Sequence, residues 1–337
     1  MRDVLSDIDR WRAEGRPIAL ATVIQTWGSA PRPAGAKMAL TADGLIAGSV
    51  SGGCVENAVI EAGKRALSTG RPELLHYGVS DDTAWSVGLA CGGTIDVFVE
   101  PLAADLYERL RAAIIRERPT AVATVIQGPD AHLGRKLLLL DDGTAAGSIS
   151  DAALSAARAA MAEGVSRRVS IEGAEIFVDV QLPPPRLVIV GGVHIAIALV
   201  ALAKTLGFRT ILVEPREAFG NATRFPHVDR IVSAWPDRAL EELDIDASTA
   251  VAVLTHDPKL DDPALSTALQ SRAFYVGALG SRRTQEKRHA RLREAGVSEE
   301  ALSRLYAPIG LDLGGRSPEE IALSIMAQIV AARNKKG

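Results

Sequence analysis

The chain has 337 residues, of which 47% are hydrophobic and 23% are charged, and its formal net charge is −3. This composition predicts a folded protein long enough for two domains and excludes a disordered chain. The small negative charge offers no basic surface for nucleic acid, so we expect no DNA or RNA partner.

The N-terminal segment and the cysteine content point to the cytoplasm. The first fifteen residues are charged where a signal peptide needs an apolar core, and two cysteines are too few for a disulfide framework. Residues 187–203 are apolar, but Gly191, Gly192 and His194 interrupt them. They are therefore interpreted as strand, turn and helix, and no membrane insertion is expected.

The first half of the chain contains an internal duplication. The stretch that starts at Thr22 is echoed from Thr124, and the matching pairs are Lys37 and Lys136, Asp43 and Asp142, Gly44 and Gly143, Gly48 and Gly147, Ser49 and Ser148, and Ser51 and Ser150. Features kept by both copies indicate architecture, and features kept by one are candidates for chemistry. Gly52, Gly53 and Cys54 stand where the second copy has residues 151–153, so this asymmetry favours Cys54 as a functional residue.

Apolar runs in this half predict strands, and amphipathic stretches predict helices. The expected strands are Ile18–Ile24, Lys37–Leu40, Ile95–Val99, Ala121–Ile126 and Lys136–Leu140, and the expected helices are Val55–Leu67 and Ala152–Ala162. Three consecutive prolines follow at 183–185 and cannot lie within a helix or a central strand. We therefore expect an α/β domain with two similar lobes over residues 1–183 and a second domain over residues 186–337.

Short strands and helices alternate in the second half. The expected strands are Arg186–Val190, Thr210–Val213, Arg230–Val232, Ala250–Leu254 and Phe274–Val276, and the expected helices are Ile195–Leu206, 281–296 and 317–334. The last helix begins with a Ser, a Pro and two Glu residues, which is a typical N-terminal cap. This alternation is typical of a Rossmann-like, doubly wound parallel sheet.

The turn after the first of these strands resembles a damaged dinucleotide fingerprint. Gly191 and Gly192 are followed by Val193, where the fingerprint needs a glycine for close approach to a pyrophosphate, and then by His194. Glu214 ends the next strand, at the place of an acidic ribose partner. The pattern favours the fold and argues against ordinary NAD(P) binding.

Ligands in such sheets lie beyond the carboxyl ends of the strands. The segments expected to converge there are Thr255-His256-Asp257, Gly277–Ser281 and Gly310-Leu311-Asp312. Gly280 and Ser281 precede a predicted helix, where backbone amides favour a phosphate. An equally open alternative is that Ser281 only caps that helix and that His256 only satisfies a local hydrogen bond.

Both cysteines adjoin glycine pairs. Cys54 follows Gly52 and Gly53 and is expected to open a helix, whose N-terminus would favour a thiolate, while Cys91 precedes Gly92 and Gly93. Small neighbours let a bulky group approach the sulfur, so we expect these thiols in glycine loops rather than in the core. Two cysteines do not make a zinc site, and a metal would arrive inside a cofactor. Arg32, Lys37, Arg282 and Arg283 could steer an anionic cofactor.

Several long segments together resemble the XdhC/CoxI family. They are residues 28–38, 48–59, 81–100, 253–265, 275–288 and 307–325, and the resemblance extends over almost the whole chain. The form of the segment around Cys91 is more similar to the CoxI-type branch. Val193 and Ala196 depart from the glycines of the family's Rossmann turn, whereas His194 matches it.

The resemblance implies a maturation factor rather than an enzyme. Family members bind molybdenum cofactor, support exchange of its terminal oxo ligand for sulfur by a cysteine desulfurase, and deliver it to a molybdenum hydroxylase apoenzyme of the xanthine dehydrogenase or CO dehydrogenase type. The family's glycine-flanked cysteines fall on Cys54 and Cys91, which could contact the molybdenum or relay sulfur. We expect a homodimer.

Two alternatives belong to other functional classes. One is an NAD(P)-linked oxidoreductase that uses the Rossmann-like domain and Glu214. The other is a thiol redox protein in which Cys54 and Cys91 form a reversible disulfide, which requires Cα atoms within about 7 Å.

Overall fold

The protein folds as two compact units, Met1–Pro183 and Pro184–Gly337. The structure is a computed structural model that describes residues 1–28, 32–78, 93–147, 149–171 and 173–334. The three prolines lie between the last strand of the first unit and the first strand of the second, where no regular hydrogen bonding is required of them.

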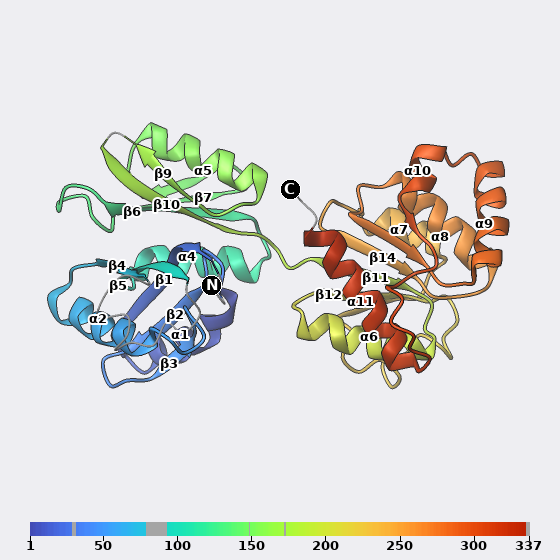
Figure 1. The fold of residues 1–337 in the computed structure, drawn as a ribbon, viewed down its shortest axis with the longest axis horizontal. Helices are drawn as coiled ribbons and strands as arrows, with labels where there is room; N and C mark the ends of the chain where they lie inside the picture. Colours follow the sequence, from blue (N-terminus) through green and yellow to red (C-terminus); the bar gives the residue numbers. More distant parts are fainter. Residues whose placement is uncertain (29–31, 79–92, 148, 172, 335–337) are drawn as a thin grey trace. The chain divides into compact units, whose positions relative to one another are not determined.

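The first unit consists of two lobes with the same order of elements (Figure 1). The first lobe contains α1 (Arg2–Ala13), β1 (Ile18–Trp27), β2 (Lys37–Thr41), β3 (Ile46–Gly48), α2 (Glu56–Thr69), β4 (Glu73–Tyr77) and β5 (Thr94–Pro101). The second contains α4 (Ala104–Ile115), β6 (Thr120–Gln127), β7 (Lys136–Leu140), β8 (Ala145–Gly147), α5 (Asp151–Glu163), β9 (Arg167–Ile171) and β10 (Ala174–Gln181).

Each lobe is an antiparallel five-stranded sheet. The strand orders are β3-β2-β1-β5-β4 and β8-β7-β6-β10-β9, so corresponding strands occupy corresponding places. All paired strands are antiparallel, and a helix, α2 or α5, connects the two edge strands of each sheet. The predicted internal duplication is confirmed.

Successive side chains of β1 point to opposite faces of the sheet, and helices cover both faces. In β1, Ala19, Ala21 and Val23 pack with α2 in one core, while Ile18 and Leu20 pack on the other side with α1 and α4. Residues of a strand point to opposite faces in turn. Both faces are therefore covered, which is why the sequence of this strand is an almost unbroken apolar run rather than an alternating one.

Helices α1 and α4 were not predicted from the sequence. In α1 only Val4, Ile8 and Trp11 are buried among charged neighbours, yet their spacing places them on one helix face. Arg111 of α4 forms an ion pair with Asp9 of α1 at 2.7 Å. The two helices pack into a core shared by both lobes.

Two crossed ion pairs also join the lobes. Lys37 of β2 contacts Asp179 of β10 at 2.8 Å, and Lys136 of β7 contacts Glu100 of β5 at 2.6 Å. Each ammonium also donates to the corresponding threonine of its own lobe, Thr22 at 3.0 Å and Thr124 at 2.8 Å. Both lysines are repeated residues, and Lys37 is only 5% exposed. The expectation that Lys37 steers a ligand is wrong, because its charge is used inside the protein.

The second unit is a six-stranded parallel sheet. Its elements are β11 (Arg186–Val190), α6 (His194–Thr205), β12 (Arg209–Val213), β13 (Arg230–Val232), α7 (Pro236–Glu242), β14 (Thr249–Val253), α8 (Pro258–Gln270), β15 (Tyr275–Ala278), α9 (Arg282–Glu294), α10 (Glu299–Ser303), β16 (Leu305–Tyr306) and α11 (Pro318–Asn334). The strand order β13-β12-β11-β14-β15-β16 confirms the Rossmann-like, doubly wound sheet.

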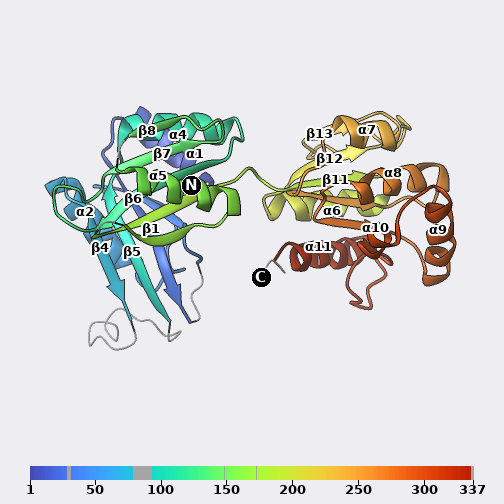
Figure 2. The same cartoon turned by 90° about the horizontal axis from the view of Figure 1, so that it is seen from above.

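Helices cover both faces of this sheet (Figure 2). Side chains of α6 and α11 form one core with one face, and those of α7, α8, α9 and α10 form another core with the opposite face. Ser317 caps α11 as predicted, by accepting a hydrogen bond from the Glu320 amide at 3.2 Å. In the part of the chain that is described, no helix has the length and apolar character that crossing a membrane requires.

Candidate functional site

The loop before α2 is organised by the carboxylate of Glu56. Its Oε1 accepts hydrogen bonds from the amides of Ser51 at 2.9 Å and Gly52 at 3.0 Å, and its Oε2 accepts one from the Gly53 amide at 2.8 Å. Burial alone would raise the pKa of Glu56, but hydrogen bonds from Ser51 and Ser49 outweigh it and lower the pKa to about 2. The loop is thus an anion-binding nest that the protein fills with its own carboxylate.

Cys54 lies at the end of this loop. The amides of Cys54 and Val55 both donate to the Ser51 hydroxyl at 3.0 Å, and α2 begins only at Glu56. The Cys54 side chain is partly buried and packs against the core of the first lobe. The helix begins one residue later than the predicted start at Val55, so Cys54 lies near the N-terminus of α2 as expected, and its side chain is partly buried at the border of the core.

The glycine pair determines the backbone course of the loop before α2. Gly52 and Gly53 have φ angles of +81° and +124°, which let the loop fold back onto Glu56. The amides of the loop itself are paired: those of Ser51, Gly52 and Gly53 donate to Glu56, and those of Cys54 and Val55 donate to Ser51. A Cβ at Gly53 would meet no atom of the described residues within 4 Å.

The second cysteine loop is only partly described. Cys91 and Gly92 lie outside the described residues, and Gly93 is buried immediately before β5. The predictions that Cys54 and Cys91 contact molybdenum, relay sulfur or form a disulfide therefore remain predictions. Within the described ranges, no three His, Cys, Asp or Glu side chains gather closely enough to hold a metal ion.

In the second unit, the predicted residues gather at the carboxyl edge where β11 and β14 are neighbours. Connections from these two strands lead to opposite faces of the sheet, which creates the crevice where Rossmann-type sheets bind ligands. His194 begins α6 at this edge and is exposed, and His256 follows β14 and is also exposed. Each histidine remains a candidate contact for a ligand.

The glycines of the first turn are required by close contacts within the protein. A Cβ on Gly191, whose φ is +108°, would lie 2.3 Å from Cγ2 of Thr255, and a Cβ on Gly192 would lie 2.3 Å from the carbonyl oxygen of Phe219. Val193 precedes α6 as its N-cap without a side-chain hydrogen bond. These glycines therefore bring neighbouring loops together at the edge of the sheet.

Glu214 is engaged by protein donors. Its side chain is 0% exposed, its Oε2 accepts from the Gly192 amide at 2.8 Å, and its Oε1 accepts from the Arg216 guanidinium at 2.8 Å. Burial would raise the pKa of Glu214, but the bonds from Arg216 and Gly192 lower it overall. A ribose hydroxyl would have to displace these partners, so Glu214 acts here as a brace between two turns.

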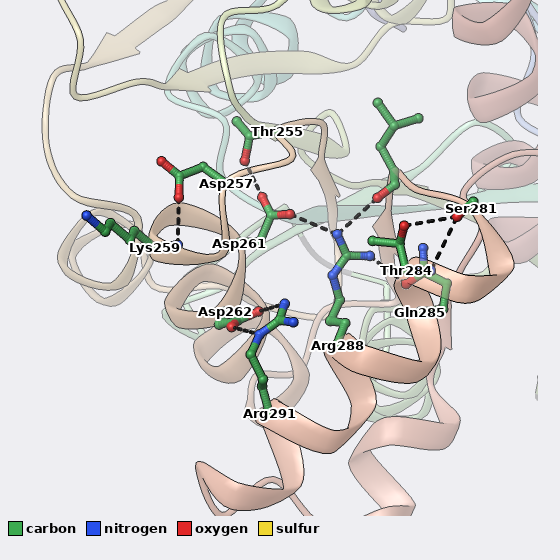
Figure 3. A network of polar contacts seen from close by, with 11 residues as sticks. Thr255, Asp257, Lys259, Asp261, Asp262, Ser281, Thr284, Gln285, Arg288 and Arg291 are labelled. Atoms are coloured by element: carbon green, nitrogen blue, oxygen red, sulfur yellow. Dashed lines mark hydrogen bonds and ion pairs between the residues drawn. The ribbon is translucent and has the colours of Figure 1, made fainter.

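A buried polar network connects the next two turns and was missed from the sequence (Figure 3). Asp261 of α8 accepts a hydrogen bond from the Thr255 hydroxyl and forms an ion pair with Arg288 of α9 at 2.8 Å. Arg288 also donates to the Leu279 carbonyl at 3.0 Å and to Oε1 of Gln285. Asp261 and Arg288 are 27 residues apart, and only the fold brings them together.

Gly280 and Ser281 form the turn between β15 and α9. Gly280 has a φ of +143°, and the Ser281 hydroxyl accepts a hydrogen bond from the Thr284 amide at 3.3 Å. Ser281 therefore caps α9, which agrees with the interpretation of Ser281 as a helix cap. Capping leaves the phosphate-binding alternative open, because a helix has four amides in its first turn that lack partners within the helix.

Comparisons with known proteins settle the family. A family model described as the XdhC Rossmann domain matches residues 187–329, and one described as the XdhC and CoxI family matches residues 11–78 and 113–172, one stretch in each lobe. The chain belongs to the XdhC and CoxI family. The predicted resemblance is confirmed.

Individual relatives of this XdhC/CoxI chain are similar over nearly its full length. A Bacillus subtilis protein named as a probable xanthine dehydrogenase subunit is 30% identical, with 94% of this chain and 93% of the relative covered. The molybdenum cofactor insertion chaperone PaoD of Escherichia coli is 28% identical, with 95% and 84% covered. A crystal structure of a xanthine dehydrogenase from Bacillus halodurans superimposes with a TM-score of 0.80 at 26% identity and covers 99% of this chain and 96% of its own.

Proposed function

We propose that this protein binds molybdenum cofactor and inserts it into an apoenzyme of the xanthine dehydrogenase or CO dehydrogenase type. The observation that carries the proposal is the similarity over 95% of the chain to a protein named as a molybdenum cofactor insertion chaperone. The similarity to a protein named for xanthine dehydrogenase supports the class of client. In this proposal the protein is an accessory factor and not an enzyme.

The described residues fit such a cofactor at its phosphate end. Molybdenum cofactor is a phosphorylated pterin dithiolene that carries the metal for the client's chemistry. Beside the Gly280 turn, Gln285 has a buried amide nitrogen that finds no partner among the described residues, and the first turn of α9 contains no acidic residue. Amide donors at a helix N-terminus suit a phosphate. Cys54 contributes a soft sulfur of the type that molybdenum accepts.

The direct test is to purify the protein from a host with ample molybdenum. We expect molybdenum and pterin to copurify in equal amounts with the full chain, and we expect the loaded protein to activate a molybdenum hydroxylase apoenzyme. A host that makes active molybdenum enzymes but yields this protein without bound pterin would contradict the proposal.

We further propose that Cys54 and Cys91 contact the metal end of the cofactor or relay sulfur supplied by a cysteine desulfurase. The glycine pairs beside both residues support this role, and so does the absence of any atom of the described residues within 4 Å of a Cβ on Gly53. Cys54→Ser and Cys91→Ser are expected to reduce retained cofactor or its sulfur content. If the double variant keeps and delivers sulfurated cofactor at the parent level, the cysteines have no part in the mechanism.

The partner and assembly predictions extend this proposal. We propose a cytoplasmic homodimer that binds a cysteine desulfurase and the client apoenzyme. Light scattering of the purified chain is expected to give twice its 35.6 kDa mass, and copurification is expected to recover both partners. A monomeric mass at micromolar concentration would overturn the dimer without affecting cofactor binding.

An NAD(P)-linked oxidoreductase is the alternative that the strand order of the second unit supports. The full engagement of Glu214 by Arg216 and Gly192 opposes it. Titration with NAD(H) and NADP(H) separates the two functions. A dissociation constant below about 10 µM, roughly −7 kcal/mol, would favour the oxidoreductase.

A further inference from the structure

Gln285 carries a buried hydrogen-bond donor for which the described residues supply no acceptor. The side chain is 6% exposed, and its Nε2 has no hydrogen-bond partner. Buried polar groups in folded proteins are nearly always paired, and an exception calls for an explanation. The surroundings of this nitrogen support one explanation, which is a ligand with an acceptor oxygen.

Arg288 fixes the orientation of the Gln285 amide. Its Oε1 accepts a hydrogen bond from Arg288, which is 1% exposed and is held by Asp261 at 2.8 Å and by the Leu279 carbonyl at 3.0 Å. Because Arg288 can only donate, the oxygen of the amide must face it. The nitrogen then faces the turn that leads into α9, as Figure 3 shows.

Gly280 lies directly beside this nitrogen. A Cβ built on Gly280 would lie 3.0 Å from the Gln285 Nε2 and 3.2 Å from Cγ2 of Thr284. Glycine at 280 therefore keeps open the space next to the unpaired donor. Its φ of +143° is a backbone conformation that other residues rarely adopt.

Helix α9 adds further donors at the same place. It is 13 residues long, and its first-turn amides and dipole favour a negative group. Other N-termini in this chain show what such amides accept: Glu320 takes those of Arg316 and Ser317 at 2.8 and 3.0 Å, and Glu56 fills the loop before α2. The first turn of α9 has no acidic residue.

We propose that the turn Leu279–Thr284 binds the phosphate group of a phosphate ester, with Gln285 Nε2 and the first amides of α9 as donors. This assignment rests on the proposed function, under which the bound group is the phosphate of molybdenum cofactor. Asp261 and Arg288 are positioning residues, since they orient the Gln285 amide without reaching the ligand.

The sharpest variant is Gln285→Glu in the full chain. It keeps the shape of the side chain and an acceptor for Arg288, but it replaces the Nε2 donor by a carboxylate oxygen that repels a phosphate. We expect inorganic phosphate, followed by calorimetric titration, to bind the variant at least tenfold more weakly than the parent. The thermal unfolding midpoint without phosphate is expected to stay equal or to rise.

A pair of glycine variants supplies a second measurement. Gly280→Ala places a methyl group against Gln285 Nε2 and is expected to lower phosphate affinity at least tenfold. Gly296→Ala, at the other end of α9, also has a positive φ, of +86°, but meets no atom within 4 Å. It serves as a control for alanine at a positive-φ glycine beside the same helix, and its phosphate affinity is expected to stay unchanged.

The outcomes separate this site from the proposed function. If the parent does not bind phosphate, or if the parent and Gln285→Glu bind it equally, the site is refuted even where molybdenum cofactor is retained. If the parent binds phosphate but retains no cofactor, the proposed function fails and the phosphate site stands. If Gln285→Glu loses phosphate but keeps cofactor at the parent level, the assignment of the site to the cofactor is wrong.

Discussion

Glu56 shows how a single side chain can set the properties of the cysteine loop. Its carboxylate accepts hydrogen bonds from the amides of Ser51, Gly52 and Gly53. The second lobe has Ser155 at the corresponding place and lacks this arrangement. Glu56 thus belongs to the same asymmetry between the copies that singled out Cys54.

We predict that Glu56→Gln destabilises the protein by about 1 kcal/mol at pH 7. The glutamine NH₂ group is a donor, and it would face backbone amides that are donors as well. The folded-state pKa of Glu56 is lowered from 4.5 to about 2. Its contribution is therefore complete above pH 4.5 and is lost as the pH falls toward 2. Urea unfolding at about pH 7 and about pH 3 should show a smaller difference between parent and variant at the lower pH.

The control for that measurement is Glu61→Gln on the exposed side of the same helix. Glu61 forms an exposed ion pair with Lys64, so its replacement should change stability by less than about 0.5 kcal/mol. A pH-independent loss at Glu56 would mean that its charge is not the stabilising feature.

Arg288 and Arg291 allow a second comparison between neighbours on one helix. Arg288 and Asp261 are 1% and 2% exposed, whereas Arg291 and Asp262 are 37% and 20% exposed. We predict that Arg288→Met costs about 3 kcal/mol of unfolding free energy, because it leaves a buried carboxylate unpaired. Arg291→Met should cost less than about 1 kcal/mol. Denaturant unfolding of both variants checks this, and equal losses would contradict it.

At this scale the sequence reveals residues whose role is local. Ser281 and Ser317 stand directly before helices, and their capping was predictable from neighbouring residues. Gln285 and Arg288 lie in a strongly charged helical stretch that is typical of solvent-exposed surface. Their burial depends on packing against α8, which no spacing within α9 discloses.

At the scale of elements, the two lobes repeat one backbone requirement. Gly48 and Gly147 have φ angles of +73° and +84°, and a Cβ on either would lie 2.3 Å from the carbonyl oxygen of the corresponding lysine, Lys37 or Lys136. The close approach of β3 to β2, and of β8 to β7, therefore requires glycine in both copies.

We predict that Gly48→Ala and Gly147→Ala each destabilise the protein more than Gly44→Ala does. Gly44 also has a positive φ, of +92°, but an added Cβ meets no atom within 4 Å. Its replacement should cost only the conformational strain of about 1–2 kcal/mol. Thermal unfolding of the three variants tests this ranking, and a Gly147 variant as stable as the parent would contradict the shared requirement.

Elements with strong apolar patterns were predictable, and weakly patterned ones were not. β7 (Lys136–Leu140), β11 (Arg186–Val190) and β13 (Arg230–Val232) have the predicted bounds. β3 and β8 have three residues each and no buried side chain, so their pairing depends on the neighbouring strand rather than on their own composition. α1 was missed because three buried side chains carry its signal.

At the scale of the whole molecule, each unit contains complete hydrophobic cores. The clusters of the second unit involve only residues from 187 to 332, and those of the first only residues from 1 to 180. Cores confined in this way are the mark of domains that can fold alone.

We predict that residues 184–337, expressed alone, fold into a cooperative α/β unit. Circular dichroism should show a single sharp thermal transition, and residues 1–183 should behave likewise. The thermal unfolding curve of the full chain should then equal the sum of the curves of the two fragments, apart from any energetic coupling between the units. A molten or aggregated second fragment would show that its cores depend on the first unit.

The crossed ion pairs make the two lobes of the first unit interdependent. Lys37 and Glu100 belong to one lobe, yet each finds its partner, Asp179 or Lys136, in the other. A lobe separated from its counterpart would leave both charges unpaired, which is costly for groups that are buried. The smallest folding unit of this half is therefore the pair of lobes and not the single lobe.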